Sequence, residues 1–188
     1  MRSIFAVVVG IAAVSVATFD VLAGAGPFRH EAQQAPAAQT VTYVTGSTID
    51  GIVAELKKGP KGPFPGQALR VVDAGPYNVG LAIVHRLRRE AQSLSHDKVT
   101  EIYQVTDGAG TLLTGGVMVE PTPASAALYA LAGPGAAGTA IKGGQSRRIA
   151  KGDVAIIPPY VPHMFTEIEG SITYLITRID PERVLNTQ

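Results

Sequence analysis

The sequence predicts an all-β fold that carries one short helix near its N-terminal end. From residue 69 onward, short apolar runs are separated by turn signals, which is the pattern of an all-β sandwich or barrel. No later segment shows a long amphipathic helix comparable to the one expected at 48–58. The chain has 188 residues, of which 46% are hydrophobic, so one domain with a sizeable core is expected.

Before residue 69, the expected elements are a strand at 41–44 and a helix at 48–58. Ser47 can cap the start of this helix, and Gly59 can end it. Its apolar stripe predicts that it packs on the outside of the β-structure. Residues 59–66 contain three glycines and three prolines, and a loop is expected there.

The strands expected after this loop are 69–74, 80–87, 100–106, 110–119, 147–149, 153–157, and 163–168 followed by 171–179. Asp107-Gly108 is predicted to be a hairpin turn between two of them. Residues 121–147 are rich in Ala, Gly, Pro and Ser, which predicts a loop insertion able to act as a lid. A short helical turn is expected within it at 125–131.

The N-terminal segment, residues 1–25, reads as a signal peptide. Arg2 precedes an apolar stretch, and a small-residue site predicts cleavage after Ala25. The alternative is an uncleaved anchor, but Asp20 leaves an uncharged run of about 17 residues, the short limit for crossing a bilayer. Residues 26–40 are expected to form a flexible leader. The mature protein is therefore expected to be exported, periplasmic or secreted, without membrane attachment.

The charge balance and composition exclude several functional classes. Lys plus Arg (16) nearly equals Asp plus Glu (15), so no single-sign field favours nucleic acid as a partner. The absence of Trp weakens the case for a base-stacking surface. Without cysteine, the chain has no disulfide, no thiolate nucleophile and no cysteine-ligated zinc.

Two segments, 88–108 and 152–167, place imidazole and carboxylate groups beside predicted strands. In the first, His96 is followed by Glu101 and Gly108; in the second, Gly152 is followed by Pro158 and His163. This spacing resembles the two signature motifs of the cupin family and would make residues 41–188 a single cupin domain.

The chain departs from the cupin motifs at four positions. In the first motif, Arg88 replaces the opening glycine and Leu94 replaces the first histidine. In the second, Tyr160 replaces a glycine and Glu167 replaces an asparagine. The spacing is thus retained while the ligand set is incomplete.

The resemblance implies a double-stranded β-helix, or jelly-roll barrel, with a divalent transition metal held by His96, Glu101 and His163. Iron, manganese, nickel, zinc and copper all remain open as the metal. Two imidazoles and one carboxylate would leave coordination positions free for water, substrate or dioxygen. The resemblance also implies a homodimer.

His85 is a further candidate ligand, in place of the histidine missing at Leu94. Leu81, Ile83 and His85 alternate with more polar positions, which predicts that this face points into the barrel. The alternatives for His85 are a metal ligand, a hydrogen-bond donor to a ligand, or a hydrogen-bonded core histidine.

Strand parity places Tyr103 on the face of Glu101, and Glu167 on the face of His163. Tyr103 could donate a proton or a hydrogen bond, and Glu167 could act as a base or orient a ligand. The alternatives are a packed core tyrosine and a solvated carboxylate. The arginines are expected to lie on solvated faces rather than in an anion site: Arg86, Arg88, Arg89, Arg147 and Arg148.

Two functional hypotheses follow. The first is a metal-dependent enzyme acting on a small organic molecule, with dioxygenase, isomerase or lyase chemistry, in which Tyr103 and Glu167 assist the metal. The second is a non-catalytic cupin that binds a small ligand or serves as a structural module. A fold shared by many activities does not choose between them.

Overall fold

A computed structural model describes residues 40–59 and 64–187 of the chain. Its elements in chain order are α1 (Gly46–Lys57), β1 (Gly66–Asp73), β2 (Asn78–Arg86), β3 (Ser93–His96), β4 (Thr100–Thr114), β5 (Val117–Val119), β6 (Thr122–Pro123), α2 (Ala126–Ala132), β7 (Gly135–Gly138), β8 (Ala140–Lys142), β9 (Gln145–Ala150), β10 (Val154–Ile157) and β11 (His163–Asp180). The predicted signal peptide and all but the last residue of the leader lie outside the described ranges. Within them, neither helix has the length and apolar character needed to cross a membrane.

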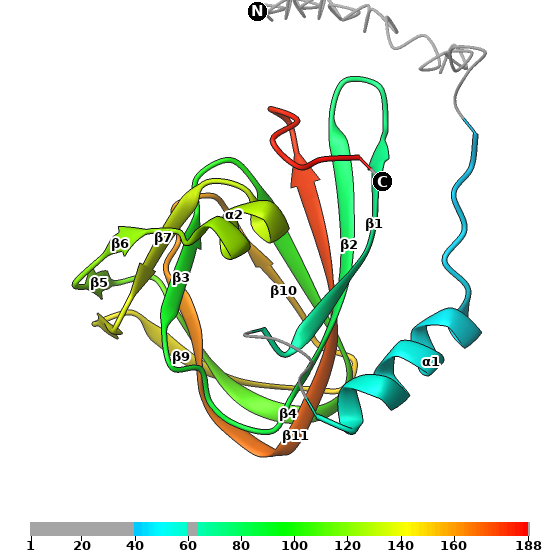
Figure 1. Cartoon of the computed structure of the whole chain (residues 1–188). Helices are drawn as coiled ribbons and strands as arrows, with labels where there is room; N and C mark the ends of the chain where they lie inside the picture. The colour runs from blue at the N-terminus through cyan, green and yellow to red at the C-terminus, as the bar shows by residue number, and fades with distance from the viewer. Residues whose placement is uncertain (1–39, 60–63, 188) are drawn as a thin grey trace, which may run out of the picture. The chain divides into compact units, whose positions relative to one another are not determined.

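The strands wind around a common interior (Figure 1), and a cluster of buried apolar side chains fills it. One sheet has the strand order β1-β2-β11-β3-β7-β6, and β4 joins it by pairing with β11, β9 and β10. Strands β5 and β8 form a separate two-stranded ladder. This arrangement confirms the predicted all-β jelly-roll architecture with a short N-terminal helix.

The predicted hairpin at Asp107-Gly108 is wrong, because β4 continues through these residues. The backbone of Gly108 has a φ of 74°, and a Cβ there would lie 1.9 Å from the carbonyl oxygen of Ser171. Strand β11, which pairs with β4 here, accommodates this conformation because the register between the two strands shifts between Ile168 and Ile172. A glycine at positive φ therefore marks a bulge rather than a chain reversal.

Helix α1 lies outside the barrel and packs against β2 (Figure 1), as the sequence predicts. Its N-cap is Thr45 rather than Ser47, and the Thr45 side chain accepts a hydrogen bond from the amide of Thr48. The strand predicted at 41–44 is wrong: these residues have no ladder partner, and the side chain of Tyr43 is exposed. A β-like pattern forms a strand only where a neighbouring strand accepts its hydrogen bonds.

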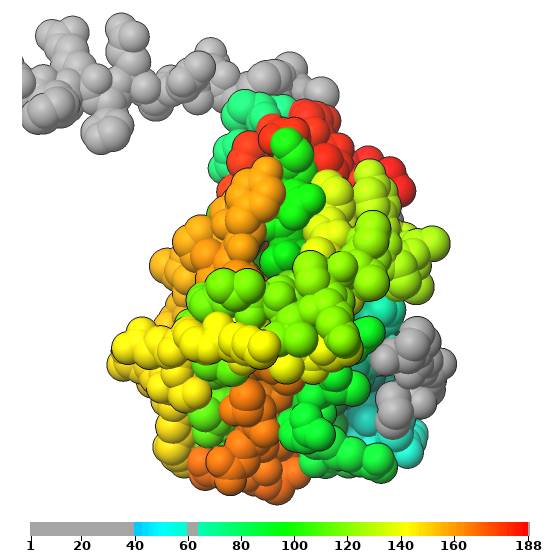
Figure 2. All heavy atoms as spheres, turned by 90° about the vertical axis from the view of Figure 1, so that its left-hand side faces the viewer, coloured from blue at the N-terminus to red at the C-terminus, as the bar shows by residue number. Residues whose placement is uncertain are grey.

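The segment predicted as a loop insertion at 121–147 instead contains β6, α2, β7 and β8. Figure 2 faces this side of the molecule, where the yellow-green to yellow segments spread across the middle of the surface. The predicted helical turn at 125–131 is present as α2, and Ser125 caps its N-terminus.

Strand β3 was not predicted, and its formation depends on small residues. It pairs with β7, which consists of glycine and alanine. A Cβ on Gly135 would lie 2.0 Å from the carbonyl oxygen of Ser95, so only glycine permits this approach. Close backbone packing therefore replaces the β-branched pattern that normally identifies a strand.

The core contains a cluster of three aromatic rings. Phe165, which is fully buried, stacks on Tyr103 with ring centroids 6.5 Å apart and lies 5.4 Å from the ring of Tyr174. The rings of Tyr103 and Tyr174 are 4.8 Å apart. These side chains fill the barrel where β4 and β11 pair.

We expect Phe165→Ala to lower the free energy of unfolding by about 3–5 kcal/mol, because it removes a ring and leaves a cavity. Denaturant-induced unfolding measures this change. Val117→Ala, at a largely exposed position, is the matched control and should cost about 0.5 kcal/mol or less. A loss below about 1 kcal/mol for Phe165→Ala would show that the core can collapse around the missing ring.

Candidate metal centre

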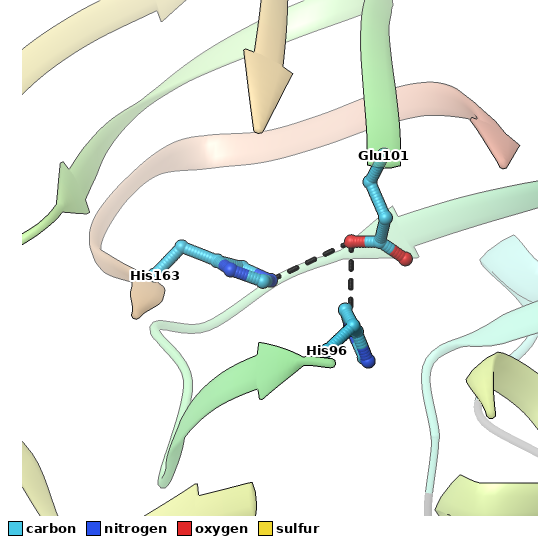
Figure 3. Close-up of side chains that lie close together, drawn as sticks. All are labelled: His96, Glu101 and His163. Carbon is cyan, nitrogen blue, oxygen red and sulfur yellow. Dashed lines mark ion pairs between the residues drawn. The ribbon is translucent and has the colours of Figure 1, made fainter. Parts of the chain in front are cut away.

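Three predicted site residues come together from three strands (Figure 3). His96 ends β3, Glu101 lies at the start of β4, and His163 begins β11. One potential ligand atom from each lies within 4.8 Å of the other two. The three residues are 5%, 1% and 1% exposed, respectively. The motif spacing thus identified residues that the fold assembles into one buried cluster.

Backbone contacts hold the two histidine-bearing segments in place. His163 pairs directly with Leu94 across the β11–β3 ladder. The amide of Tyr160 donates a hydrogen bond of 2.7 Å to the carbonyl oxygen of His96. The connection between β10 and β11 is therefore tied to the end of β3, and this brings the two imidazoles to a ring-centroid distance of 5.5 Å.

The imidazole of His163 is oriented by its own backbone neighbour. Its Nδ1 donates a hydrogen bond of 3.0 Å to the carbonyl oxygen of Val161. In the neutral ring this leaves the lone pair on Nε2, which is buried and has no hydrogen-bond partner within the described ranges. Burial lowers the pKa of His163, but the Glu101 carboxylate, 3.5 Å from Nε2, outweighs burial and raises the pKa. The Nδ1 of His96 is likewise buried without a partner. The free Nε2 of His163 faces Glu101 and can bind a ligand that the protein itself does not supply. In His96 the nitrogen that faces Glu101 is Nε2, so its orphaned Nδ1 is not part of the cluster.

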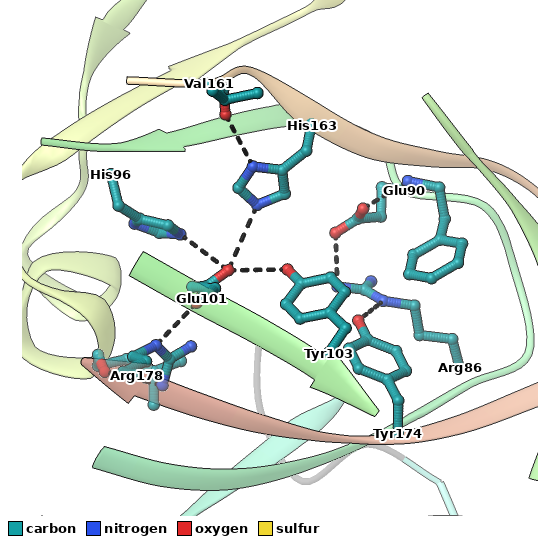
Figure 4. A network of polar contacts seen from close by, with 11 residues as sticks. Arg86, Glu90, His96, Glu101, Tyr103, Val161, His163, Tyr174 and Arg178 are labelled. Atoms are coloured by element: carbon teal, nitrogen blue, oxygen red, sulfur yellow. Dashed lines mark hydrogen bonds and ion pairs between the residues drawn. The ribbon is translucent and has the colours of Figure 1, made fainter. Parts of the chain in front are cut away.

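Glu101 is the centre of a polar network, shown in Figure 4. Arg178 Nε donates a 2.8 Å hydrogen bond to its Oε1, and Tyr103 Oη donates one of 2.9 Å to its Oε2. Burial raises the pKa of Glu101, but the Arg178 guanidinium and the His96 imidazole outweigh it and hold the pKa well below the usual range. The carboxylate is therefore ionised, the form that binds metals.

Tyr103 lies with the site, as predicted from strand parity. Burial and the charge of Glu101 raise the pKa of Tyr103 well above its ordinary value. Its hydroxyl is therefore protonated and acts as a hydrogen-bond donor to Glu101.

The geometry and donor chemistry of the cluster fit a divalent transition metal. The Nε2 atoms of His96 and His163 each lie 3.5 Å from Glu101 Oε2. Two ligand atoms bonded tetrahedrally to one ion at about 2.1 Å lie about 3.4 Å apart, close to this separation. Imidazole nitrogen and carboxylate oxygen suit iron, manganese, nickel, zinc or copper.

The predicted inward orientation of His85 is wrong. Its β2 neighbours Ala82 and Val84 belong to the core cluster, so His85 lies on the opposite face of the strand. There its Nδ1 shares a 2.8 Å hydrogen bond with Thr173 Oγ1. The face was misassigned because the inward side carries Arg86, which forms an ion pair of 2.5 Å with Glu90 instead of facing solvent.

The predicted position of Glu167 is also wrong, because its side chain is exposed. The register of β11 with β4 shifts between Phe165 and Glu167, so the intervening Thr166 is an extra residue. A bulge of one residue reverses the alternation of side chains that follows it. Glu167 therefore points away from His163 and Phe165.

Arg178, the cation that holds Glu101, was not identified from the sequence. It lies directly opposite Glu101 in the β4–β11 ladder and is 5% exposed. Its Nη1 also donates a 3.3 Å hydrogen bond to the carbonyl oxygen of Leu131 in α2. The sequence did offer one indication of its role. By strand alternation, Arg178 lies on the same face as Tyr174 and Ile176, where a core residue is expected.

A cavity of about 400 Å³ lies along β9 and β10 near this cluster. Its wall includes Ala155 and Ile157, which pair with Tyr103 and Glu101 respectively, and also Val161. A second cavity of about 400 Å³ lies beneath α1 and includes His85. The first adjoins the strands that carry the site, while the site side chains themselves remain buried.

Neither a protein-family model nor a curated protein matches the sequence. Among solved structures, a cupin protein from Bacteroides fragilis is 16% identical, with a TM-score of 0.36 over 58% of this chain and 72% of that one. KdgF from Halomonas sp. is 16% identical, with a TM-score of 0.40 over 66% and 87%. The protein BH2720 from Bacillus halodurans is 12% identical, with a TM-score of 0.41 over 82% and 89%. Cupin proteins are thus among the structures to which this chain is similar.

We expect Arg178→Met to lower the free energy of unfolding by about 3–5 kcal/mol in metal-free protein, because it leaves the Glu101 carboxylate buried without its counter-cation. Chemical denaturation in the presence of a chelator measures the change. Arg178→Met/Glu101→Met is the matched control and should recover much of the loss, since no charge is then stranded. A double variant no more stable than Arg178→Met would argue against stranded charge as the cause.

Proposed function

We propose that this chain is an exported metal-binding protein of the cupin type. His96, Glu101 and His163 bind one divalent transition metal, and a small organic molecule binds beside it. The observation that carries the proposal is the buried Nε2 of His163, which has no hydrogen-bond partner within the described ranges and lies at ion-pair distance, 3.5 Å, from the ionised carboxylate of Glu101. Nitrogen lone pairs beside a buried carboxylate form a donor set for a cation.

An enzymatic role is supported by the number of ligands. Three protein ligands leave positions open to a small molecule, as in catalytic rather than structural metal sites. When bound, the metal would supply Lewis-acid chemistry or bind dioxygen. Arg178 and Tyr103 keep Glu101 ionised and oriented, each by one hydrogen bond to a different oxygen. Dioxygenase, isomerase and lyase reactions are all compatible with this arrangement.

A second candidate is a non-catalytic module that binds metal or a small ligand. The observation favouring it is the packing next to the site, where Tyr103 stacks with Phe165 and Tyr174 in the core. The site residues are also at most 5% exposed. A closed apolar surrounding is typical of a site that stabilises the barrel rather than turning over a substrate.

Export rests on the sequence of residues 1–25, and homodimerisation rests on the cupin resemblance. Intact mass of protein expressed with its N-terminus should show cleavage after Ala25, and light scattering should give the mass of a dimer. A full-length mass or a monomer would remove the corresponding part of the proposal.

Metal content is the direct test. Protein purified without a histidine tag should contain close to one iron, manganese, nickel, zinc or copper per chain by elemental mass spectrometry. We expect His96→Ala and His163→Ala each to lose this metal, because each removes one of the three ligands that the described residues supply.

His85→Ala is the matched control, since it removes a buried histidine that does not belong to the cluster. It should retain the metal. If folded wild-type protein takes up no metal even after reconstitution, the metal-binding proposal fails.

The two candidates differ in whether the metal has an open coordination position. In protein reconstituted with cobalt, added azide should shift the visible absorption spectrum if the site accepts an outside ligand. An unchanged spectrum, with cobalt still bound, would favour the closed, non-catalytic module.

A further inference from the structure

The cavity beneath α1 has an apolar wall and an open rim. It has a volume of about 400 Å³ and lies between the C-terminal turn of the helix, residues 64–65 and the connection from β2 to β3. Leu56, Phe64 and Leu87 contribute apolar surface to it. The volume lies within the range typical of small-molecule pockets.

The rim of this cavity is positively charged. Arg88 and Arg89 both line it and are exposed. Among the residues that the structure describes, no carboxylate pairs with either guanidinium. The other charged residues of the lining, Arg86 and Glu90, neutralise each other through an ion pair of 2.5 Å. The two rim arginines therefore give the cavity a net positive charge.

A buried imidazole adds a directed polar group to the wall. His85 is 6% exposed, and its Nδ1 is occupied by Thr173 Oγ1. Its Nε2 has no hydrogen-bond partner within the described part of the chain, and the residue lines the cavity. Burial, reinforced by the nearby charge of Lys57, lowers the pKa of His85. At neutral pH the ring is therefore uncharged and offers one hydrogen-bonding atom.

We propose that this cavity binds a small carboxylate that has an apolar body. The carboxylate lies between Arg88 and Arg89, the apolar body packs against Leu56 and Phe64, and His85 hydrogen-bonds the ligand. Guanidinium groups recognise carboxylates through charge-assisted hydrogen bonds, while an apolar wall selects the rest of the molecule. None of the three metal-cluster residues lines this cavity, and the proposal does not depend on a bound metal.

Octanoate is a suitable probe, with 1-octanol as its uncharged counterpart and acetate as the carboxylate without an apolar body. Titration calorimetry at low salt should detect octanoate binding, with octanol and acetate each weaker by about tenfold or more, since each lacks one of the two recognised features. Arg88→Gln/Arg89→Gln should weaken octanoate binding by about tenfold or more without unfolding the protein, because both side chains are exposed.

Arg70→Gln is the matched control, because Arg70 is an exposed arginine on β1 outside the lining. Its octanoate affinity should stay within about twofold of wild type. Leu87→Asp, which adds a carboxylate at the exposed rim, should abolish octanoate binding. Absence of octanoate binding to wild type, equal affinity for octanoate and octanol, or equal effects of the rim and control variants would each overturn the proposal.

Discussion

The antiparallel ladder between β4 and β11 is the constraint on which the rest of this structure depends. It places Arg178 opposite Glu101 and Ile176 opposite Tyr103, so the carboxylate meets its counter-cation as a consequence of strand register. The same ladder begins at His163. A slip of one residue would turn these side chains to the outside of the barrel. Fold and site are therefore specified by one set of backbone hydrogen bonds.

The bulges in this ladder explain where sequence reasoning succeeded and where it failed. The candidate ligands His96, Glu101 and His163 were recoverable because the resemblance to the cupin motifs implies them, and motif spacing can be compared without knowledge of the partner strands. The orientation of Glu167 was not, because one extra residue after Phe165 reverses the strand parity. A bulge is defined by how a strand pairs with its partner. The sequence of one strand therefore does not show where a bulge will occur.

The orientation of β2 failed for a different physical reason. Both faces of this strand are largely buried, so alternating hydrophobicity does not reveal which face meets the core. The inward face includes Arg86, whose charge is compensated by Glu90 and whose Nε donates a 2.9 Å hydrogen bond to Tyr174 Oη. Once a buried ion pair satisfies an arginine, that residue no longer marks the solvent side of a strand.

The charge balance of the metal cluster limits what can bind there. In the metal-free protein, the negative charge of Glu101 is matched by Arg178, which also holds the last turn of α2 through the Leu131 carbonyl. Imidazoles bind metals in their neutral form, so a divalent cation would add two uncompensated positive charges to a site whose residues are at most 5% exposed. Buried charge without compensation is costly, and the cost falls when an anion enters with the metal. An anionic molecule would therefore bind the loaded site more favourably than a neutral molecule of the same shape.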